Sequence, residues 1–287
     1  MAGRNDRQRR QARERYRRQQ EARSARRQQL RKRWLAGGSA VLAAALIASL
    51  LLVFLPGGNS AKKPTAAASK SKSTSSTSAA AVSEPAHHCT YTKAGTAAKT
   101  VSIPPATPDY TASYTATIKT NLGNISFNLL NSKATCTVNS FVHLAEAGYF
   151  NNTQCHRLVN SGIYVLQCGD PYATASTKLT CSSTAKAGTG TPGYDFASEN
   201  LTGAKYPAGT IAMANEGTST SNGSQFFIVF KDSTSGLTAS YTPFATVSSG
   251  LGIVQNVAKS GTSCQYSAGG GAPKKKVIID SVTVKKT

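Results

Sequence analysis

The sequence lacks the motifs that identify several large classes of enzyme. No pair of its six cysteines has C-x-x-C spacing, and no second ligand pair accompanies His87 and His88, so a zinc site is not expected. The loop "NEGTSTSNGSQ" lacks the G-K-[ST] ending of a phosphate-binding loop, and Ser224 is not in G-x-S-x-G. The run "GTGTPG" (188–193) matches a dinucleotide fingerprint in letters only, because a Ser/Thr-rich loop precedes it. We therefore expect no metal, no cofactor and no nucleophilic hydrolase.

Arginine is almost absent beyond the first 33 residues. Residues 1–33 hold 13 arginines and carry a net charge of +11, whereas residues 34–287 carry +10 and contain one arginine, Arg157. Every other basic residue of the longer part is lysine, so positive charge alone does not explain Arg157. A dense basic arm can bind nucleic acid by neutralising phosphates. The segment that follows favours a topological role instead, and no nucleic-acid partner is expected.

That segment, residues 34–55, reads "WLAGGSAVLAAALIASLLLVFL", which is 22 residues without a charge. A helix of this length is about 33 Å long and spans a bilayer core of roughly 30 Å. Basic residues precede it, so the positive-inside rule places residues 1–33 in the cytoplasm and the remainder outside. The alternative is a cleaved signal peptide, but the stretch exceeds the usual roughly 7–15 apolar residues and no A-x-A-like site follows closely. We expect a single-pass transmembrane helix in the cell membrane.

Composition divides the rest of the chain into three parts. Residues 56–88 are rich in Ser, Ala, Thr and Lys and have almost no large apolar side chain, which predicts a disordered tether. Residues 89–114 contain "SIPPATPDY" and are expected to form an extended, proline-stiffened lead-in. Residues 115–287 have the patterning of a folded domain and are long enough to bury one core.

All six cysteines lie beyond the apolar segment, where the expected compartment is oxidising. An even number of cysteines there favours disulfides. Six cysteines allow 15 pairings, so counting leaves the connectivity open. The positions are 89, 136, 155, 168, 181 and 264.

The domain reads as mainly β. Residues 114–130 form two alternating apolar and polar runs around "NLGN", a hairpin signature. Residues 137–148 have apolar positions at helical spacing, with Thr137 as a plausible N-cap and Gly148 at the end, and residues 249–261 predict a short second helix. Further strands are expected in 155–170, 209–215, 224–230, 242–247 and 274–286. Many short strands without β-α-β alternation argue for a closed antiparallel barrel.

Five residues in or beside these apolar strands form the most informative pattern: Arg157, Gln167, Asn215, Gln225 and Phe227. One polar group in such a strand is usually a satisfied core or rim group. Four hydrogen-bonding groups that do not titrate near neutral pH, among apolar and aromatic neighbours, indicate instead a groove for a neutral polar polymer. Peptide backbone is the obvious candidate.

The blocks "CHRLVNSGIYVLQCGDP", "GTGTPGY", "FASEN", "GTIAMAN", "NGSQFFIVF" and "YTPFATV" resemble, in order, the core blocks of the cyclophilins, the peptidyl-prolyl cis/trans isomerases. The resemblance covers roughly residues 115–284. It implies a closed eight-stranded antiparallel barrel capped by two α-helices. Because the chain combines these blocks with a basic arm, an apolar segment and a tether, it is similar to the membrane-anchored extracytoplasmic cyclophilins of Gram-positive bacteria.

The resemblance also implies site residues. Arg157 is similar to the family's catalytic arginine and Gln167 to the glutamine that orients it, while Phe227 is similar to the floor of the proline pocket. Expected partners are proline-containing segments of exported or unfolded proteins, with a cyclosporin-type ligand as a further candidate. The substrate-binding residues that the resemblance implies are Tyr164, Val165, Met213, Ala214, Asn215, Gln225, Phe227, Leu237 and Tyr241.

This chain departs from the family pattern at several places near Arg157. Two extra residues separate Arg157 from Gln167, which puts the pocket aromatic on Tyr164. Tyr241 stands where a histidine is usual. An insertion, "YATASTKLTCSSTAKA" (172–187), carries one of the cysteines.

The expected reaction needs neither an acid nor a nucleophile. Rotation about an X–Pro bond breaks amide resonance over a barrier of about 20 kcal/mol, and a guanidinium aimed at the proline nitrogen would stabilise only the twisted bond. The alternative is a catalytically inactive cyclophilin-like module that binds or scaffolds peptides at the cell surface. The family's order of elements also suggests that Cys136 pairs with Cys155 and that Cys89 pairs with Cys181 or Cys264.

Overall fold

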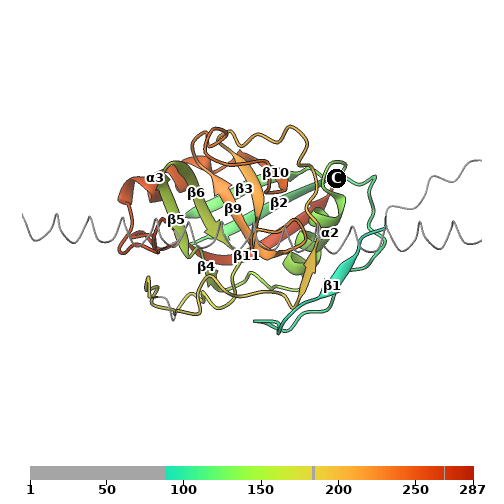
Figure 1. The fold of residues 1–287 in the computed structure, drawn as a ribbon, viewed down its shortest axis with the longest axis horizontal. Helices are drawn as coiled ribbons and strands as arrows, with labels where there is room; N and C mark the ends of the chain where they lie inside the picture. The colour runs from blue at the N-terminus through green and yellow to red at the C-terminus, as the bar shows by residue number, and fades with distance from the viewer. Residues whose placement is uncertain (1–87, 183–184, 268) are drawn as a thin grey trace, which may run out of the picture. The chain divides into compact units, whose positions relative to one another are not determined.

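The computed structural model describes residues 88–182, 185–267 and 269–287 (Figure 1). The expected cytoplasmic arm, transmembrane segment and all but the last residue of the tether lie outside these ranges. Within them, no helix has both the length and the apolar character that crossing a membrane requires. The description that follows concerns the part from His88 onward.

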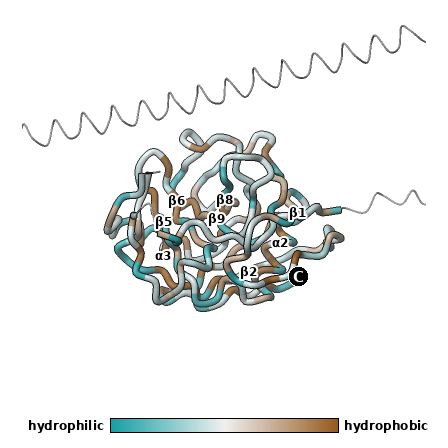
Figure 2. Tube along the Cα trace, turned by 60° about the horizontal axis from the view of Figure 1, so that its bottom comes forward, coloured by the Kyte–Doolittle hydropathy of each residue, from teal (hydrophilic) through white to brown (hydrophobic). Residues whose placement is uncertain are grey.

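Eleven strands form one antiparallel sheet in the described part of the chain, and two helices lie at opposite sides of it (Figures 1 and 2). The strands pair in the order β1-β7-β9-β8-β10-β3-β2-β11-β4, with β6 also paired to β9 and β5 paired to β6. The elements are β1 (Tyr91–Lys93), β2 (Tyr114–Thr120), β3 (Gly123–Leu129), α2 (Thr135–Glu146), β4 (Thr153–Gln154), β5 (Arg157–Ser161), β6 (Ile163–Cys168), β7 (Tyr194–Phe196), β8 (Thr210–Asn215), β9 (Asn222–Val229), β10 (Pro243–Ser249), α3 (Leu251–Ser260) and β11 (Ile278–Lys286).

The expected closed eight-stranded barrel is therefore wrong in strand number and in closure. No ladder joins β5 to β4 within the described residues, so the sheet stays open. The outer edge of β5 is instead covered by a loop, because Leu158 and Gly271 exchange both backbone hydrogen bonds at 2.8 and 2.9 Å. Short strands β1 and β7, which the sequence pattern did not predict, lengthen the other side of the sheet.

The main core lies between the sheet and α2. Buried residues alternate with less buried ones along β2 and β3, as a sheet with one buried face requires. Phe141 of α2 packs on four other phenylalanine rings with centroid separations of 5.3–5.8 Å. Those rings belong to Phe127 of β3, Phe150 after α2, Phe226 of β9 and Phe244 of β10. One helical side chain thus contacts three strands of the sheet.

The sequence located both helices and the first hairpin, but it placed the helix cap incorrectly. In the β2–β3 hairpin, Thr120 pairs with Gly123, whose φ of 120° favours glycine. Helix α2 begins at Thr135, and its first-turn N–H groups of Cys136 and Thr137 donate to the Glu199 carboxylate at 3.1 and 2.7 Å. Thr137 is thus inside the helix, and a distant acid caps it.

The lead-in is part of the folded domain. Cys89 is buried and bonded to Cys136 at the start of α2, and β1 adds to the sheet by pairing with β7. The Tyr91 hydroxyl donates to the Cys136 carbonyl at 2.7 Å. The segment is therefore held by a disulfide, a strand pair and a side-chain hydrogen bond, rather than being only an extended approach.

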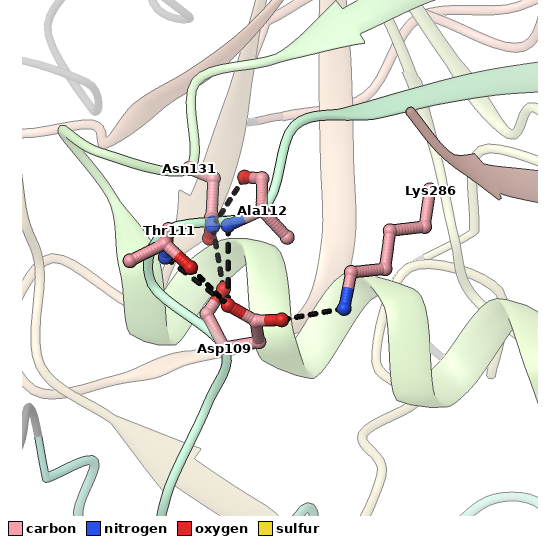
Figure 3. Close-up of polar contacts among 5 residues, drawn as sticks. All are labelled: Asp109, Thr111, Ala112, Asn131 and Lys286. Atoms are coloured by element: carbon pink, nitrogen blue, oxygen red, sulfur yellow. Dashed lines mark hydrogen bonds and ion pairs between the residues drawn. The ribbon is translucent and has the colours of Figure 1, made fainter.

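A polar cluster fixes the end of the lead-in near the C-terminus (Figure 3). The Asp109 carboxylate accepts hydrogen bonds from the backbone N–H groups of Thr111 and Ala112. It also forms an ion pair with Lys286 at 2.5 Å. Hydrogen bonds from Lys286 and Thr111 lower the pKa of Asp109 to about 2. Asn131 donates to two lead-in carbonyls at 2.8 Å, which joins this turn to the chain after β3.

The disulfide connectivity differs from the expectation. Cys136 bonds to Cys89, not to Cys155. Cys155 bonds to Cys168 at the open end of the β5–β6 hairpin, where the two Cα atoms are 4.0 Å apart. The third bond joins Cys181 of the insertion to Cys264, so neither of these is the partner of Cys89.

Candidate active site

Arg157 and Gln167 are placed by the β5–β6 hairpin. The two strands pair with Arg157 directly opposite Gln167, and their buried neighbours Leu158 and Leu166 belong to the main core. The Arg157 Nη1 atom donates to Gln167 Oε1 at 3.2 Å. This hydrogen bond puts Gln167 in a position to orient the guanidinium.

A chain of amide hydrogen bonds extends from Arg157 to the loop after the insertion. Gln167 Nε2 donates to Gln225 Oε1 at 2.9 Å, and Gln225 Nε2 donates to the carbonyls of Gly188 and Gly190 at 3.2 and 3.0 Å. Carbonyl oxygens can only accept, so they fix which end of the Gln225 amide faces them. With the Gln225 amide in that orientation, its Oε1 atom faces Gln167 and must accept from Gln167 Nε2. The Oε1 atom of Gln167 is then left to accept from Arg157.

The other side of the guanidinium is held by a residue that sequence reasoning missed. Arg157 Nε donates to the Gly269 carbonyl at 2.9 Å. Desolvation by burial lowers the pKa of Arg157, but the side chain stays protonated because its ordinary pKa is so high. Bonds at Nη1 and Nε together fix the plane of the guanidinium.

An apolar cavity of about 100 Å³ adjoins this pair. Its apolar side chains form a small cluster on the sheet face opposite the main core. The ring of Tyr241 meets that of Phe227 edge-on with centroids 5.5 Å apart. The lining residues are Arg157, Ile163, Val165, Gln167, Ala214, Asn215, Phe227, Leu237 and Tyr241, of which only Ile163 was not predicted.

Tyr164 and Met213 do not line this cavity, although the sequence assigned both to it. Side chains alternate between the two faces of a strand, so Ile163 and Val165 face the cavity and Tyr164 faces away. The Tyr164 ring packs on Phe230 with centroids 6.0 Å apart. Met213 is buried in the main core. Both assignments are wrong by one strand position.

A second cavity, of about 110 Å³, is polar and shares Gln167, Ala214 and Asn215 with the apolar one. Gln225 lines this cavity and not the apolar one. Asp195 and Glu216 also line it, and burial followed by the nearby Glu216 charge raises the pKa of Asp195.

The Asn215 side chain is engaged within the fold. Its Nδ2 atom donates to the Ser240 carbonyl at 2.8 Å, and its Oδ1 atom accepts from Gly217 N–H at 3.0 Å. These bonds leave the Ala214–Asn215 backbone, rather than the amide, as the group suited to bind a peptide.

His156, the residue before Arg157, is 2% exposed. Neither ring nitrogen has a hydrogen-bond partner among the described residues. Burial lowers the pKa of His156 to about 4, so the ring is neutral at physiological pH. In the same part of the chain, no group of three His, Cys, Asp or Glu side chains is placed to hold a metal ion.

The family model described as "Cyclophilin type peptidyl-prolyl cis-trans isomerase/CLD" matches residues 115–284. A protein of Mycobacterium leprae named "Probable peptidyl-prolyl cis-trans isomerase B" is 42% identical over 214 residues, which are 68% of this chain and 66% of the relative. The protein of the same name in Mycobacterium tuberculosis strain H37Rv is 42% identical over 192 residues, or 61% of this chain and 56% of the relative. The match thus spans just under two thirds of the length of the first relative and just over half of the length of the second.

Among solved structures, a cyclophilin type peptidyl-prolyl cis-trans isomerase of Cryptosporidium parvum aligns with a TM-score of 0.48 at 25% identity, covering 61% of this chain and 99% of the other. The family model covers more than half of the present chain, and it includes every residue of the apolar cavity and of the amide chain. The chain therefore belongs to the cyclophilin-type peptidyl-prolyl cis-trans isomerase family.

Proposed function

We propose that this protein accelerates cis/trans isomerisation of X–Pro bonds in polypeptides, with Arg157 as the catalytic residue. The observation that carries the proposal is a guanidinium fixed at two of its nitrogens beside an apolar cavity of about 100 Å³. Family membership and the two mycobacterial relatives named as isomerases support it.

The uncatalysed rotation is slow because the twisted bond loses amide resonance. In the twisted bond the proline nitrogen becomes pyramidal and its lone pair can accept a hydrogen bond. A donor that reaches this nitrogen lowers the barrier without stabilising either planar form, which is how differential binding accelerates a reaction. No covalent intermediate or proton transfer is required.

The site residues divide this task. Phe227 and Leu237 offer an apolar surface to the proline ring, while the backbone of Ala214 and Asn215 is suited to hold the adjacent peptide in extended form. Arg157 then donates toward the imide nitrogen. Because Gln167 and Gly269 hold the guanidinium beforehand, little reorganisation is needed when the bond twists.

Part of the same proposal is that the protein acts on exported or partly folded chains outside the cytoplasm, as a membrane-anchored cyclophilin of the Gram-positive type. Three disulfides support an oxidising compartment. The uncharged segment at residues 34–55 and its basic flank support an anchor with the N-terminus inside.

The direct test is an isomerisation assay of the purified full chain in detergent with a short proline peptide. Wild-type protein should accelerate the cis-to-trans step, and Arg157→Ala should lose most of the acceleration. The control is Lys259→Ala, which removes a cation from α3. If Arg157→Ala keeps full activity, the catalytic assignment is wrong; if wild type binds the peptide without accelerating it, the protein is a peptide-binding module.

A further inference from the structure

A third cavity, of about 290 Å³, adjoins the site at Arg157 and Gln167. These are the two residues that it shares with the apolar cavity, so the same pair of side chains borders both spaces. Neither the proposed reaction nor the proline pocket accounts for this third space. His156, which directly precedes β5, also lines it, and its other walls come from two loops that lie far apart in the sequence.

One wall is formed by Cys181, Ser182 and Ala187 of the insertion and by Gly188 and Thr189 directly after it. The opposite wall is the loop between α3 and β11, which contributes Tyr266 and Ser267. The Cys181–Cys264 disulfide joins the two loops across a sequence separation of 83. A covalent link between the walls restricts their relative movement before any ligand binds, and preorganisation of this kind favours binding.

The α3–β11 loop also makes hydrogen bonds to the residues directly before and after Arg157 in the sequence. The Tyr266 hydroxyl donates to the His156 carbonyl at 3.1 Å, and Gly271 exchanges two backbone hydrogen bonds with Leu158. The same loop supplies the Gly269 carbonyl to Arg157. The walls of the third cavity are thus built onto the strand that carries the catalytic side chain.

The charge of the lining selects against a cation. Among the described lining residues, Arg157 is the one charged side chain and there is no carboxylate. The Tyr266 ring, the disulfide and Ala187 present apolar surface, and the polar side chains of the lining are those of Arg157, His156, Gln167, Ser182, Thr189 and Ser267. A lysine or arginine entering here would meet the guanidinium at short range, whereas an aromatic or aliphatic side chain would replace water on apolar surface.

We propose that this cavity is a subsite for an apolar side chain of the substrate, aromatic or aliphatic, at a residue that flanks the isomerising proline. We assign the occupant to the peptide in the apolar cavity, because Arg157 and Gln167 line both spaces and adjacent residues of a chain are only about 3.8 Å apart. The inference rests on the proposed function and specifies its substrate class. The enzyme then selects X–Pro bonds in apolar sequence, which is exposed in unfolded chains.

The test measures kcat/KM of the full chain on one X–Pro peptide in which each flanking residue is replaced in turn by Phe, Leu, Ala, Lys or Glu. At one flanking position, wild type should prefer Phe or Leu over Ala by roughly tenfold, and Lys should be the poorest. Ser267→Trp, which fills the cavity, should reduce the Phe-to-Ala ratio to about one. Ser176→Trp is the matched control, because this exposed serine of the insertion does not line the cavity, and it should keep the ratio.

Tyr266→Ala provides a second variant in case the tryptophan disturbs the loop, and it should lower the preference for Phe more than that for Leu. The subsite is refuted if wild type shows no flanking preference, if Lys or Glu is preferred, or if the Phe-to-Ala ratio survives both cavity variants. If no peptide is isomerised at all, the proposed function fails instead. Affinities of the same peptides, measured by fluorescence anisotropy, then test the subsite separately by the same ratio.

Discussion

Removing the Gln167 side chain should slow catalysis without removing the catalytic group. In Gln167→Ala, Arg157 loses the partner of Nη1 but keeps the Gly269 carbonyl at Nε. A hydrogen bond to a charged group contributes about 1.5–3 kcal/mol. The lower end applies here, because the 3.2 Å separation is at the long limit for such a bond and one anchor remains. About 1.5 kcal/mol corresponds to a roughly tenfold fall in kcat/KM.

The fall should appear mainly in kcat, because an orienting bond acts on the twisted bond more than on the bound planar peptide. The assay is steady-state isomerisation of one peptide, with thermal unfolding to confirm that the variant is folded. Gln255→Ala is the matched control, since that glutamine lies on α3 and donates to the Phe230 carbonyl instead. A Gln167→Ala enzyme within twofold of wild type would refute the orienting role.

Three further predictions concern stability and are checked by urea unfolding. The folded-state pKa of His156, about 4, lies below its ordinary 6.5, so between these pH values the unfolded chain binds a proton that the folded chain lacks. The free energy of unfolding of wild type should therefore fall by about 3 kcal/mol from pH 6.5 to pH 4, relative to that of His156→Gln. If the free energy of unfolding changes equally with pH in both proteins, the prediction is contradicted. Glu199→Ala should cost about 1–2 kcal/mol because two first-turn N–H groups of α2 lose their acceptor, and no change would show that α2 does not need the cap. Replacing Cys155 and Cys168 together by alanine should cost about 2–4 kcal/mol by freeing a loop with a sequence separation of 13, and an unchanged stability would mean that the hairpin register alone holds these positions.

Local pattern was sufficient where neighbours in sequence determine structure. Alternation predicted the β2–β3 hairpin, and helical spacing predicted α2 and α3. Four of the five residues in the most informative pattern also came together: Arg157, Gln167, Asn215 and Phe227 line one cavity. These features follow from periodicity and composition, which a single sequence contains.

Errors arose where the answer depends on strand register or on distant residues. A shift of one residue moves a strand side chain to the other face, which is why Ile163 rather than Tyr164 lines the apolar cavity. Gly269 lies 112 residues from Arg157 in a glycine-rich loop, and a backbone carbonyl leaves no signal in side-chain chemistry. The open sheet has the same cause, because that loop occupies the edge of β5 where a barrel would place a strand.

The most direct test of the account is to measure exchange and affinity on one peptide with wild type and Arg157→Ala. Exchange spectroscopy on the peptide's own cis and trans signals gives the catalysed rate, and titration gives the dissociation constant. Because Arg157 is held to stabilise the twisted bond and not the bound planar forms, the variant should bind within a fewfold of wild type and lose the exchange almost entirely. Exchange that persists in Arg157→Ala, or a loss of affinity that accounts for the whole loss of rate, would contradict the account.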